Sequence, residues 1–301
     1  MLVLLKDKNY PNLLKKIGKQ APEQLYYKGE WSNDIFENCL AVVGSRRMTS
    51  YGKQVAEKIT GEVAAAGITI VSGFMYGIDA TAHKTTLSVG GKTIAVMPCG
   101  SDIVHPDYQQ DLYTGILKNK GLIISEYEDG RAPAKWTYPQ RNRIVAGISK
   151  AVLVVEAGEK SGSLITANWA KKFNRKIFVI PGPITSENSK GIMQLIKEGA
   201  TPISSAQDIF DYYQINYIRG LSAQSGSTFY VRGRTSNIKE KIVGEDKKTE
   251  IKIIEQLQRE AMDINDMARF LNIKTAELGT ILSLMHLKGK IKLIGNKYYV
   301  S

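Results

Sequence analysis

The chain has 301 residues, of which 43% are hydrophobic and 23% charged, so it is globular and long enough for one large and one small domain. Its formal net charge of +12 at pH 7 suits a polyanionic partner such as nucleic acid. The excess is concentrated between Lys118 and Lys176, where 12 Lys and Arg oppose 5 Asp and Glu, a local charge of 12 − 5 = +7.

The composition argues against a membrane, secreted or metal-binding protein. No apolar run approaches about 18 residues, and charged residues interrupt the first apolar residues early. Cys39 and Cys99 are far apart and each lies beside an apolar run, which indicates free thiols in a reducing compartment. With only three histidines besides, they are too few for a four-ligand metal cluster. We therefore expect a cytoplasmic protein with no cofactor, no metal and no membrane partner.

Residues 1–36 are predicted to be a short lead-in, in which Leu13, Leu14 and Ile17 have helical spacing and pack on the main domain. In residues 37–213, near-continuous Val/Ile runs alternate with helical patterns, which indicates a mostly parallel sheet covered on both faces. Right-handed crossovers then produce a doubly wound, Rossmann-like α/β domain. The predicted strands are 40–44, 68–72, 93–97, 121–125, 151–155, 176–180 and 200–203.

The C-terminal part is predicted to be a separate small domain. Residues 214–247 lack a sustained period and are rich in Ser and Gly, as a linker is. Residues 248–301 show three helical patterns, with Asp263 as a plausible N-cap, and two short strands around Gly295-Asn296, which is a winged-helix pattern. Winged helices often bind duplex DNA, but the third helix here is mostly apolar, so a protein partner is an equal alternative.

The first motif is Gly44-Ser45-Arg46-Arg47, which follows the first strand of the main domain. It lacks the second glycine of the dinucleotide fingerprint, and the next strand ends in Ser72-Gly73 instead of an acidic residue, so NAD binding is disfavoured. Free N–H groups at a helix start, together with the fork of Arg46, are suited to a phosphate. The alternative is a surface arginine on an ordinary turn.

The second motif is the stretch SGFMYGIDATAH. Gly73 and Gly77 allow sharp turns whose free N–H groups are predicted nucleic-acid contacts, and Asp79 is a plausible cap for the following helix. Asp79 and His83 are four residues apart and share a helix face, as an acid/base pair would. A helix-start carboxylate beside a hydrogen-bonded histidine is the favoured interpretation, because no Ser or Cys nucleophile accompanies them in a known motif.

The third motif is WTYPQRNRIVAG, which interleaves aromatic and basic residues. Bases of single-stranded nucleic acid stack on aromatic faces while phosphates follow basic side chains. The alternative is an aromatic pair packed at a domain edge beside solvated arginines. The predicted nucleic-acid contacts here are Trp136, Tyr138, Arg141, Asn142 and Arg143.

The fourth motif is Ser161-Gly162-Ser163, which opens a helix after the strand that ends near Glu156. Hydroxyls and free N–H groups at a helix start form a second anion cradle. The simpler interpretation is a serine N-cap. Because both turns follow parallel strands, they are expected to meet at one edge of the sheet, which favours the cradle.

The ordered set of motifs resembles the DNA processing protein A family (DprA, also called Smf) from about Tyr10 to Phe210. The motifs are VVGSR, SGxxxGIDAxAH, GGKTIAVMPCGSD, SEYxxG, PQRNRIVAGISKAVLVVEA, SGSLITA, VIPGP and LIKEGA. The resemblance implies a non-enzymatic homodimer that binds single-stranded DNA in a basic pocket, holds incoming DNA during natural transformation and helps to load the RecA recombinase. It places Gly44–Arg46, Arg141–Arg143 and Ser161–Ser163 in that pocket.

Four positions depart from the family pattern. Met75 and Tyr76 replace a small and a basic residue, His105 replaces the tyrosine before Pro106, and Met193 replaces an asparagine. The loss of the basic residue changes the phosphate contacts, and Tyr76 is suited to stack on a base instead. The dimer face is expected near Ile192, Leu195 and Ile196, from family and apolar character.

Two other functions remain open from the sequence. A related Rossmann-like protein would bind a nucleotide-derived ligand or cleave one as a phosphoribohydrolase, with Glu156 on the ribose. The Pro-Gly-Gly-x-Gly-Thr-x-x-Glu signature of those enzymes is missing, because residues 158–163 read GEKSGS. In the other alternative the chain is an adaptor whose winged helix recruits a partner.

Overall fold

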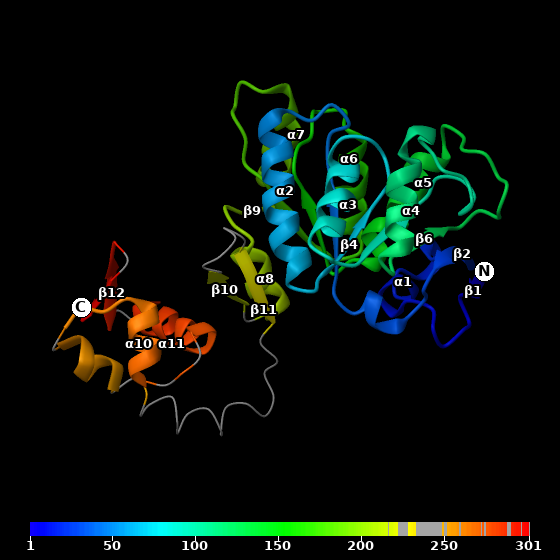
Figure 1. Cartoon of the computed structure of the whole chain (residues 1–301). Coiled ribbons are helices and arrows are strands. Elements are labelled where there is room, and N and C mark those ends of the chain that lie inside the picture. The colour runs from blue at the N-terminus through cyan, green and yellow to red at the C-terminus, as the bar shows by residue number, and fades with distance from the viewer. Residues whose placement is uncertain are drawn as a thin grey trace. The chain divides into compact units, whose positions relative to one another are not determined.

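The computed structural model describes residues 1–215, 217–221 and 228–232, and residues 249–300 except 250, 251, 259, 272, 274, 288, 289 and 296. The chain divides into two compact units, Met1–Tyr217 and Ile218–Ser301 (Figure 1). The first unit contains the predicted lead-in together with the sheet domain.

A nine-stranded sheet forms the centre of the first unit, in the order β1-β2-β6-β5-β4-β3-β7-β8-β9. All neighbours from β6 through β9 in this order are parallel, while β1 and β2 are antiparallel additions at one edge. The predicted doubly wound, mostly parallel sheet is therefore confirmed. The strands are β1 (Leu2–Leu4), β2 (Gln24–Gly29), β3 (Cys39–Val43), β4 (Thr69–Ser72), β5 (Thr93–Val96), β6 (Leu122–Ser125), β7 (Ala151–Val154), β8 (Lys176–Val179) and β9 (Thr201–Pro202).

Helices cover both faces of the sheet because successive residues of each strand point to opposite sides. In β3, Ala41 and Val43 pack in one apolar core and Leu40 and Val42 in another. The first face holds α1 (Asn12–Lys15), α5 (Thr137–Ile148), α6 (Gly162–Lys172) and α7 (Lys190–Lys197). The second holds α2 (Ser50–Ala65), α3 (Ile78–Ser88), α4 (Gln110–Lys118) and α8 (Gln207–Tyr213).

Capping residues mark both ends of α2, and both cysteines are buried. Thr49 caps α2, because its hydroxyl accepts a hydrogen bond from Gly52 N at 3.0 Å. The helix ends before Gly67, whose φ of 81° is the left-handed conformation expected of the residue after a C-cap. Cys39 and Cys99 are buried free thiols, as predicted.

The lead-in has more structure than the single packed helix that the sequence predicts. β1 pairs with β2, and β2 continues the sheet alongside β6, while Leu14 of α1 is buried in the main core. The apolar pattern of β2 is weak in the sequence because Leu25 is its one fully buried residue, although the strand pairs on both sides.

Two of the three residues expected near a dimer face on α7 are buried in their own chain, and the dimer face itself stays a prediction. Ile192 is 1% exposed and Leu195 is 4% exposed, because both side chains point into the core of their own chain. Only Ile196 of the three is partly accessible. The apolar residues of α7 recur at helical spacing, and Ile192 and Leu195 among them pack on the sheet of their own chain.

The described residues from Tyr217 to Val300 form two small sheets and three helical segments. In the region predicted to be a linker, β10 (Tyr217–Leu221) pairs with β11 (Thr228–Arg232), which is a correction, and the rest of 216–248 lies outside the described residues. Five-residue strands flanked by Gly and Ser carry too short a pattern to be seen in the sequence. Residues 252–258 are helical and are followed by α10 (Ile264–Leu271), α11 (Thr275–Leu287), β12 (Ile291–Ile294) and β13 (Lys297–Val300).

These last elements follow the predicted order and share a core of their own. Asp263 caps α10 as predicted, because its Oδ1 accepts hydrogen bonds from Asn265 N at 2.8 Å and Asp266 N at 2.9 Å. The winged-helix assignment stays a prediction, and Asn296 of its predicted turn lies outside the described residues. No helix that the structure describes is long and apolar enough to cross a membrane.

Candidate nucleic-acid interface

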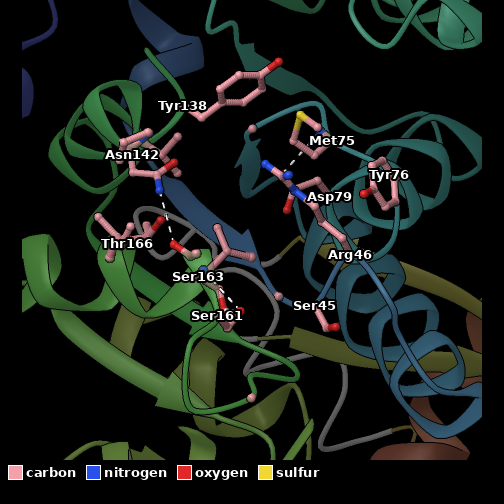
Figure 2. A pocket seen from close by; sticks show the side chains of 18 of the residues that line it. Ser45, Arg46, Met75, Tyr76, Asp79, Tyr138, Asn142, Ser161, Ser163 and Thr166 are labelled. Atoms are coloured by element: carbon pink, nitrogen blue, oxygen red, sulfur yellow. Dashed lines mark hydrogen bonds between the residues drawn. The ribbon is translucent and has the colours of Figure 1, made fainter. Parts of the chain in front are cut away.

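The strand order reverses at β3, which has β4 on one side and β7 on the other. In open α/β sheets the crevice beyond the carboxyl ends at such a point is the usual ligand site. A cleft of about 850 Å³ occupies this place (Figure 2). The predicted residues that line it are Gly44, Ser45, Arg46, Arg47, Gly73, Tyr138, Arg141, Asn142, Ser161, Gly162 and Ser163, whereas Gly77, Trp136 and Arg143 do not.

The turn after β3 is held from two sides. Ser45 Oγ accepts a hydrogen bond from Arg47 N at 3.1 Å, and Ser45 O accepts one from Ile78 N at 3.2 Å. Asn188, from the loop before α7, donates to Arg47 O at 2.7 Å. The backbone is fixed in this way while the side chains of Arg46 and Arg47 remain exposed to solvent. No local motif in the sequence marks Asn188, because its hydrogen-bond partner Arg47 lies 141 residues away in the chain.

Arg46 lies close to two aromatic rings at the mouth of the cleft. Its Cζ is 5.8 Å from the centroid of Tyr76 and 5.6 Å from the centroid of Tyr138. The hydroxyl of Tyr138 is in turn 2.7 Å from Nε2 of His105. Cation–π attraction restrains the guanidinium without using its N–H donors, so these stay available for an anion.

Gly73 and Gly77 are needed for close packing around the cleft. Gly77 has a φ of 82°, and a Cβ at this position would lie 2.4 Å from Ser45 O. A Cβ on Gly73 would lie 2.2 Å from the guanidinium of Arg141. Gly77 also occupies the N-cap position of α3, which corrects the expectation for Asp79. Asp79 lies within the first turn and accepts a hydrogen bond from Met75 N at 3.4 Å.

Arg141 is buried beneath the cleft, with 3% of its surface exposed. Its guanidinium donates to the carbonyl oxygens of Gly73 and Val96, at the ends of β4 and β5. Burial lowers the pKa of Arg141 to about 10, and the nearby Asp79 opposes this shift. Burial likewise raises the pKa of Asp79, with Arg141 acting in the opposite direction. Arg141 therefore ties two strand ends together while it lines the cleft, and its contact with a phosphate stays a prediction.

The guanidinium of Arg143 is also bound within the protein, outside the cleft. It forms a two-pronged ion pair with Glu126, at 2.7 Å for Nη1–Oε1 and 2.6 Å for Nη2–Oε2, and its Nε donates to Gln20 O at 2.9 Å. Residues two apart on a helix point to nearly opposite sides, so one stripe cannot carry both arginines of the motif. Arg143 joins the lead-in to α5 instead of lining the cleft, which corrects its predicted position.

The first turn of α6 forms the opposite wall of the cleft. Ser161 is its N-cap, with Oγ 3.4 Å from Ser163 N and 2.7 Å from Ser163 Oγ. Asn142 reaches across from α5 and donates to Gly162 O at 3.3 Å. The two interpretations of this motif are therefore compatible, because Ser161 caps α6 and the capped turn also lines the cleft.

Two exposed lysines that the sequence analysis did not select also line the cleft. Lys135 precedes α5 and Lys160 precedes α6. With Arg46 and Arg47 they form a set of four exposed cations around one opening. Each lysine lies within or beside a motif that was recognised, so their proximity to those motifs was the available signal.

The residues of the enzymatic alternatives are not arranged for catalysis. His83 is buried and its Nδ1 lies 2.7 Å from Thr93 Oγ1, and burial lowers its pKa to about 3. This is the hydrogen-bonded histidine that the sequence favoured. Glu156 accepts hydrogen bonds from Thr49 N at 2.9 Å and Thr49 Oγ1 at 2.5 Å, so its carboxylate fastens the start of α2 and does not line the cleft.

A family model described as DNA recombination-mediator protein A matches residues 1–214. The chain belongs to this family. It is 38% identical over 207 residues to DNA processing protein DprA of Bacillus subtilis and 41% identical over 208 residues to that of Streptococcus pneumoniae. These matches cover 69% of this chain in both cases, and 69% and 72% of the two relatives. A protein named Smf from Synechocystis is 41% identical over 67% of this chain, but the match spans only 51% of that relative's length.

Solved structures of the DprA family have the same fold as the first unit. The X-ray structure of DprA from S. pneumoniae superposes with a TM-score of 0.65 at 39% identity, covering 70% of this chain and 73% of that one. DprA from Helicobacter pylori superposes with a TM-score of 0.61 at 29% identity, covering 71% and 96%. The latter structure is described as showing a single-stranded DNA binding mode.

Proposed function

We propose that the cleft binds single-stranded DNA and that the protein acts without catalysis in DNA processing during transformation and recombination. The observation that carries this proposal is the set of four exposed cations, Arg46, Arg47, Lys135 and Lys160, around one 850 Å³ opening at the point where the strand order reverses. The name of the family and the description of its H. pylori member support the same ligand.

The chemistry of the cleft suits an unpaired strand. Its volume is in the range that proteins use for small ligands, so it admits individual nucleotides more readily than a rigid duplex. The cations attract phosphates, and the exposed ring of Tyr76 and the partly exposed ring of Tyr138 offer faces to bases. Contacts of this type do not depend on sequence, because every phosphate has the same charge and every base has a π face.

A salt titration of binding to fluorescent poly-dT and to a matched duplex tests the proposal. We expect the single strand to be preferred, with a log–log slope of about −3 if four phosphates are neutralised. Absence of poly-dT binding at moderate salt would contradict the proposal and direct attention to small nucleotides. The position of Glu156 outside the cleft already argues against ribose cleavage by that residue.

We further propose that the protein acts in the cytoplasm, helps to load RecA and forms a homodimer. The family description as a recombination mediator supports loading of RecA onto the bound strand. We expect the protein to shorten the lag of RecA filament formation on single-stranded DNA, which an ATPase time course measures. We also expect a homodimer, which light scattering after gel filtration at several concentrations detects; a monomer at all of them would contradict this part alone.

A further inference from the structure

A compact group of aromatic and basic side chains lies outside the cleft, in the segment between β6 and α5. Cζ of Arg131 is 4.9 Å from the ring centroid of Tyr127 and 5.4 Å from that of Trp136. The two rings meet edge to face, with centroids 5.8 Å apart and planes at 87°. Tyr127 is buried, but 52% of Trp136 is exposed and Arg131 is exposed as well. Trp136 therefore packs against Tyr127 while about half of its surface stays exposed to solvent.

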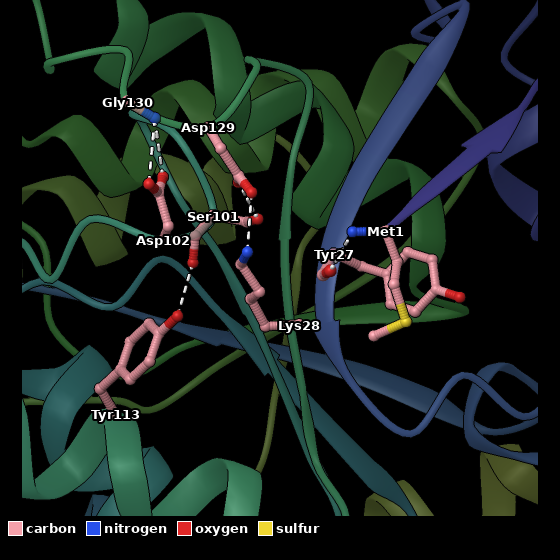
Figure 3. Close-up of polar contacts among 8 residues, drawn as sticks. All are labelled: Met1, Tyr27, Lys28, Ser101, Asp102, Tyr113, Asp129 and Gly130. Carbon is pink, nitrogen blue, oxygen red and sulfur yellow. Dashed lines mark hydrogen bonds and ion pairs between the residues drawn. The ribbon is translucent and has the colours of Figure 1, made fainter.

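The segment that carries this group is fastened to the rest of the fold (Figure 3). Gly130 N donates to both carboxylate oxygens of Asp102, at 2.9 and 3.1 Å. Asp129 accepts hydrogen bonds from Lys28 at 2.7 Å and from Ser101 at 2.8 Å. Anchoring on several sides means that binding a ligand here costs little additional ordering of the loop.

The positive charge of Arg131 is not neutralised within the protein. Among the described residues, no carboxylate lies within ion-pair distance of its guanidinium, whereas the neighbouring Glu126 and Asp129 are paired with Arg143 and Lys28. The main-chain carbonyl of Arg131 accepts a hydrogen bond from Gly100, so the backbone is fixed while the charge faces solvent.

The group lies next to the mouth of the cleft. Trp136 is bonded directly to Lys135, which lines the cleft, and Tyr138, the second residue of α5, lines it as well. A strand that leaves the cleft past Lys135 therefore meets Trp136 and Arg131 next. An aromatic face beside an unneutralised cation is the pairing that binds a base and its phosphate without regard to sequence.

We propose that Trp136 and Arg131 form a second nucleotide-binding platform, on which a base stacks on Trp136 while Arg131 neutralises the adjoining phosphate. This platform extends the single-strand path beyond the cleft and rests on the proposed function. It makes affinity depend on oligonucleotide length, since a strand held wholly within the cleft does not reach it.

Tryptophan fluorescence and length-dependent affinity test the platform together. The chain has three tryptophans, and Trp31 and Trp169 are both less exposed than Trp136. We expect oligo-dT of about 20 nucleotides to quench the fluorescence of the wild-type protein and of the control Trp169→Phe, but not that of Trp136→Phe. Trp136→Phe should keep most of the affinity because it keeps an aromatic face.

Trp136→Ala should weaken binding of the 20-mer about tenfold and that of an oligo-dT of about 4 nucleotides much less. Arg131→Gln should make the log–log salt slope for the 20-mer shallower by about 0.7, which corresponds to one phosphate contact. A variant that had lost its fold would also lose its affinity for the 4-nucleotide oligo-dT. In that case the fluorescence quenching of Trp136→Phe tests the platform instead.

Quenching that persists in Trp136→Phe, or equal affinities of wild type and Trp136→Ala at both lengths, would overturn the platform while the cleft still binds. A wild-type protein that binds oligo-dT of neither length would overturn the proposed function and the platform with it. The two failures are therefore distinguishable.

Discussion

The guanidinium of Arg46 lies 5.6 Å from the ring centroid of Tyr138, so a residue of the turn after β3 is held by a residue of α5 across the cleft. Cation–π contact attracts the charge but leaves the five N–H donors free. An arginine restrained in this way loses less conformational entropy when it binds a phosphate. Figure 2 shows this arrangement at the opening of the cleft.

Arg46→Glu should weaken binding of single-stranded DNA by roughly 100-fold, because it removes a charge-assisted contact and places a carboxylate beside the phosphates. Stability should change little, since Arg46 is exposed. The matched control is Lys118→Glu, an exposed residue at the end of α4, which runs back toward the opposite edge of the sheet. Equal affinities of the two variants in fluorescence anisotropy would contradict the role of Arg46.

Tyr76 is expected to contribute by its aromatic face, since it is 42% exposed and lies 5.8 Å from the guanidinium of Arg46. Tyr76→Ala should reduce affinity about tenfold without changing the salt slope, because no charge is lost. Tyr76→Arg, which restores the basic residue usual in the family, should instead steepen the slope by about 0.7. A shallower slope in Tyr76→Arg would show that the position does not meet a phosphate.

Replacement of Arg141 should destabilise the fold. Arg141→Met leaves the buried carbonyls of Gly73 and Val96 without their donor and removes the positive charge that favours the ionised form of the buried Asp79. We expect a loss of about 3 kcal/mol or more in the free energy of unfolding, measured by urea titration. Arg46→Gln serves as the control, with an expected change within about 0.5 kcal/mol. Similar stabilities of the two variants would mean that Arg141 is not structural.

His83 should make stability depend on pH. Burial lowers its pKa from 6.5 to about 3, so the unfolded chain binds a proton in this interval that the folded chain does not. Stability is therefore full above about pH 6.5 and falls as the pH decreases toward 3, by about 1.4 kcal/mol per pH unit from this group alone.

His83→Leu tests this linkage, since it removes the titrating group and loses one hydrogen bond, to Thr93, and the ring contact with Phe74. Urea unfolding of both proteins between pH 7.5 and 4.5 should show a shallower decline for the variant. Because the carboxylates are the same in both, the difference between the two curves isolates His83. Parallel curves would contradict the buried, neutral state of this histidine.

The comparison of Arg46 with Arg141 and Arg143 shows how far sequence reasoning reaches. All three are arginines in motifs that resemble the same family, and the sequence places all three in a phosphate pocket. Only Arg46 has an exposed guanidinium, whereas the other two are buried by carbonyls and by Glu126. Burial depends on which side of α5 meets which strand end, and this is a property of the packing and not of the motif.

By itself, the sequence determined the alternation of strands and helices, the parallel sheet and the turns that meet at its carboxyl edge. These follow from local rules, because apolar runs form buried strands and Gly or Ser turns open helices. Only the tertiary structure decided which charges face solvent, that β1 and β2 of the lead-in join the sheet, and that Trp136 pairs with Arg131 outside the cleft. Those outcomes depend on contacts between residues far apart in the chain, or on side-chain direction, and a one-dimensional pattern contains neither.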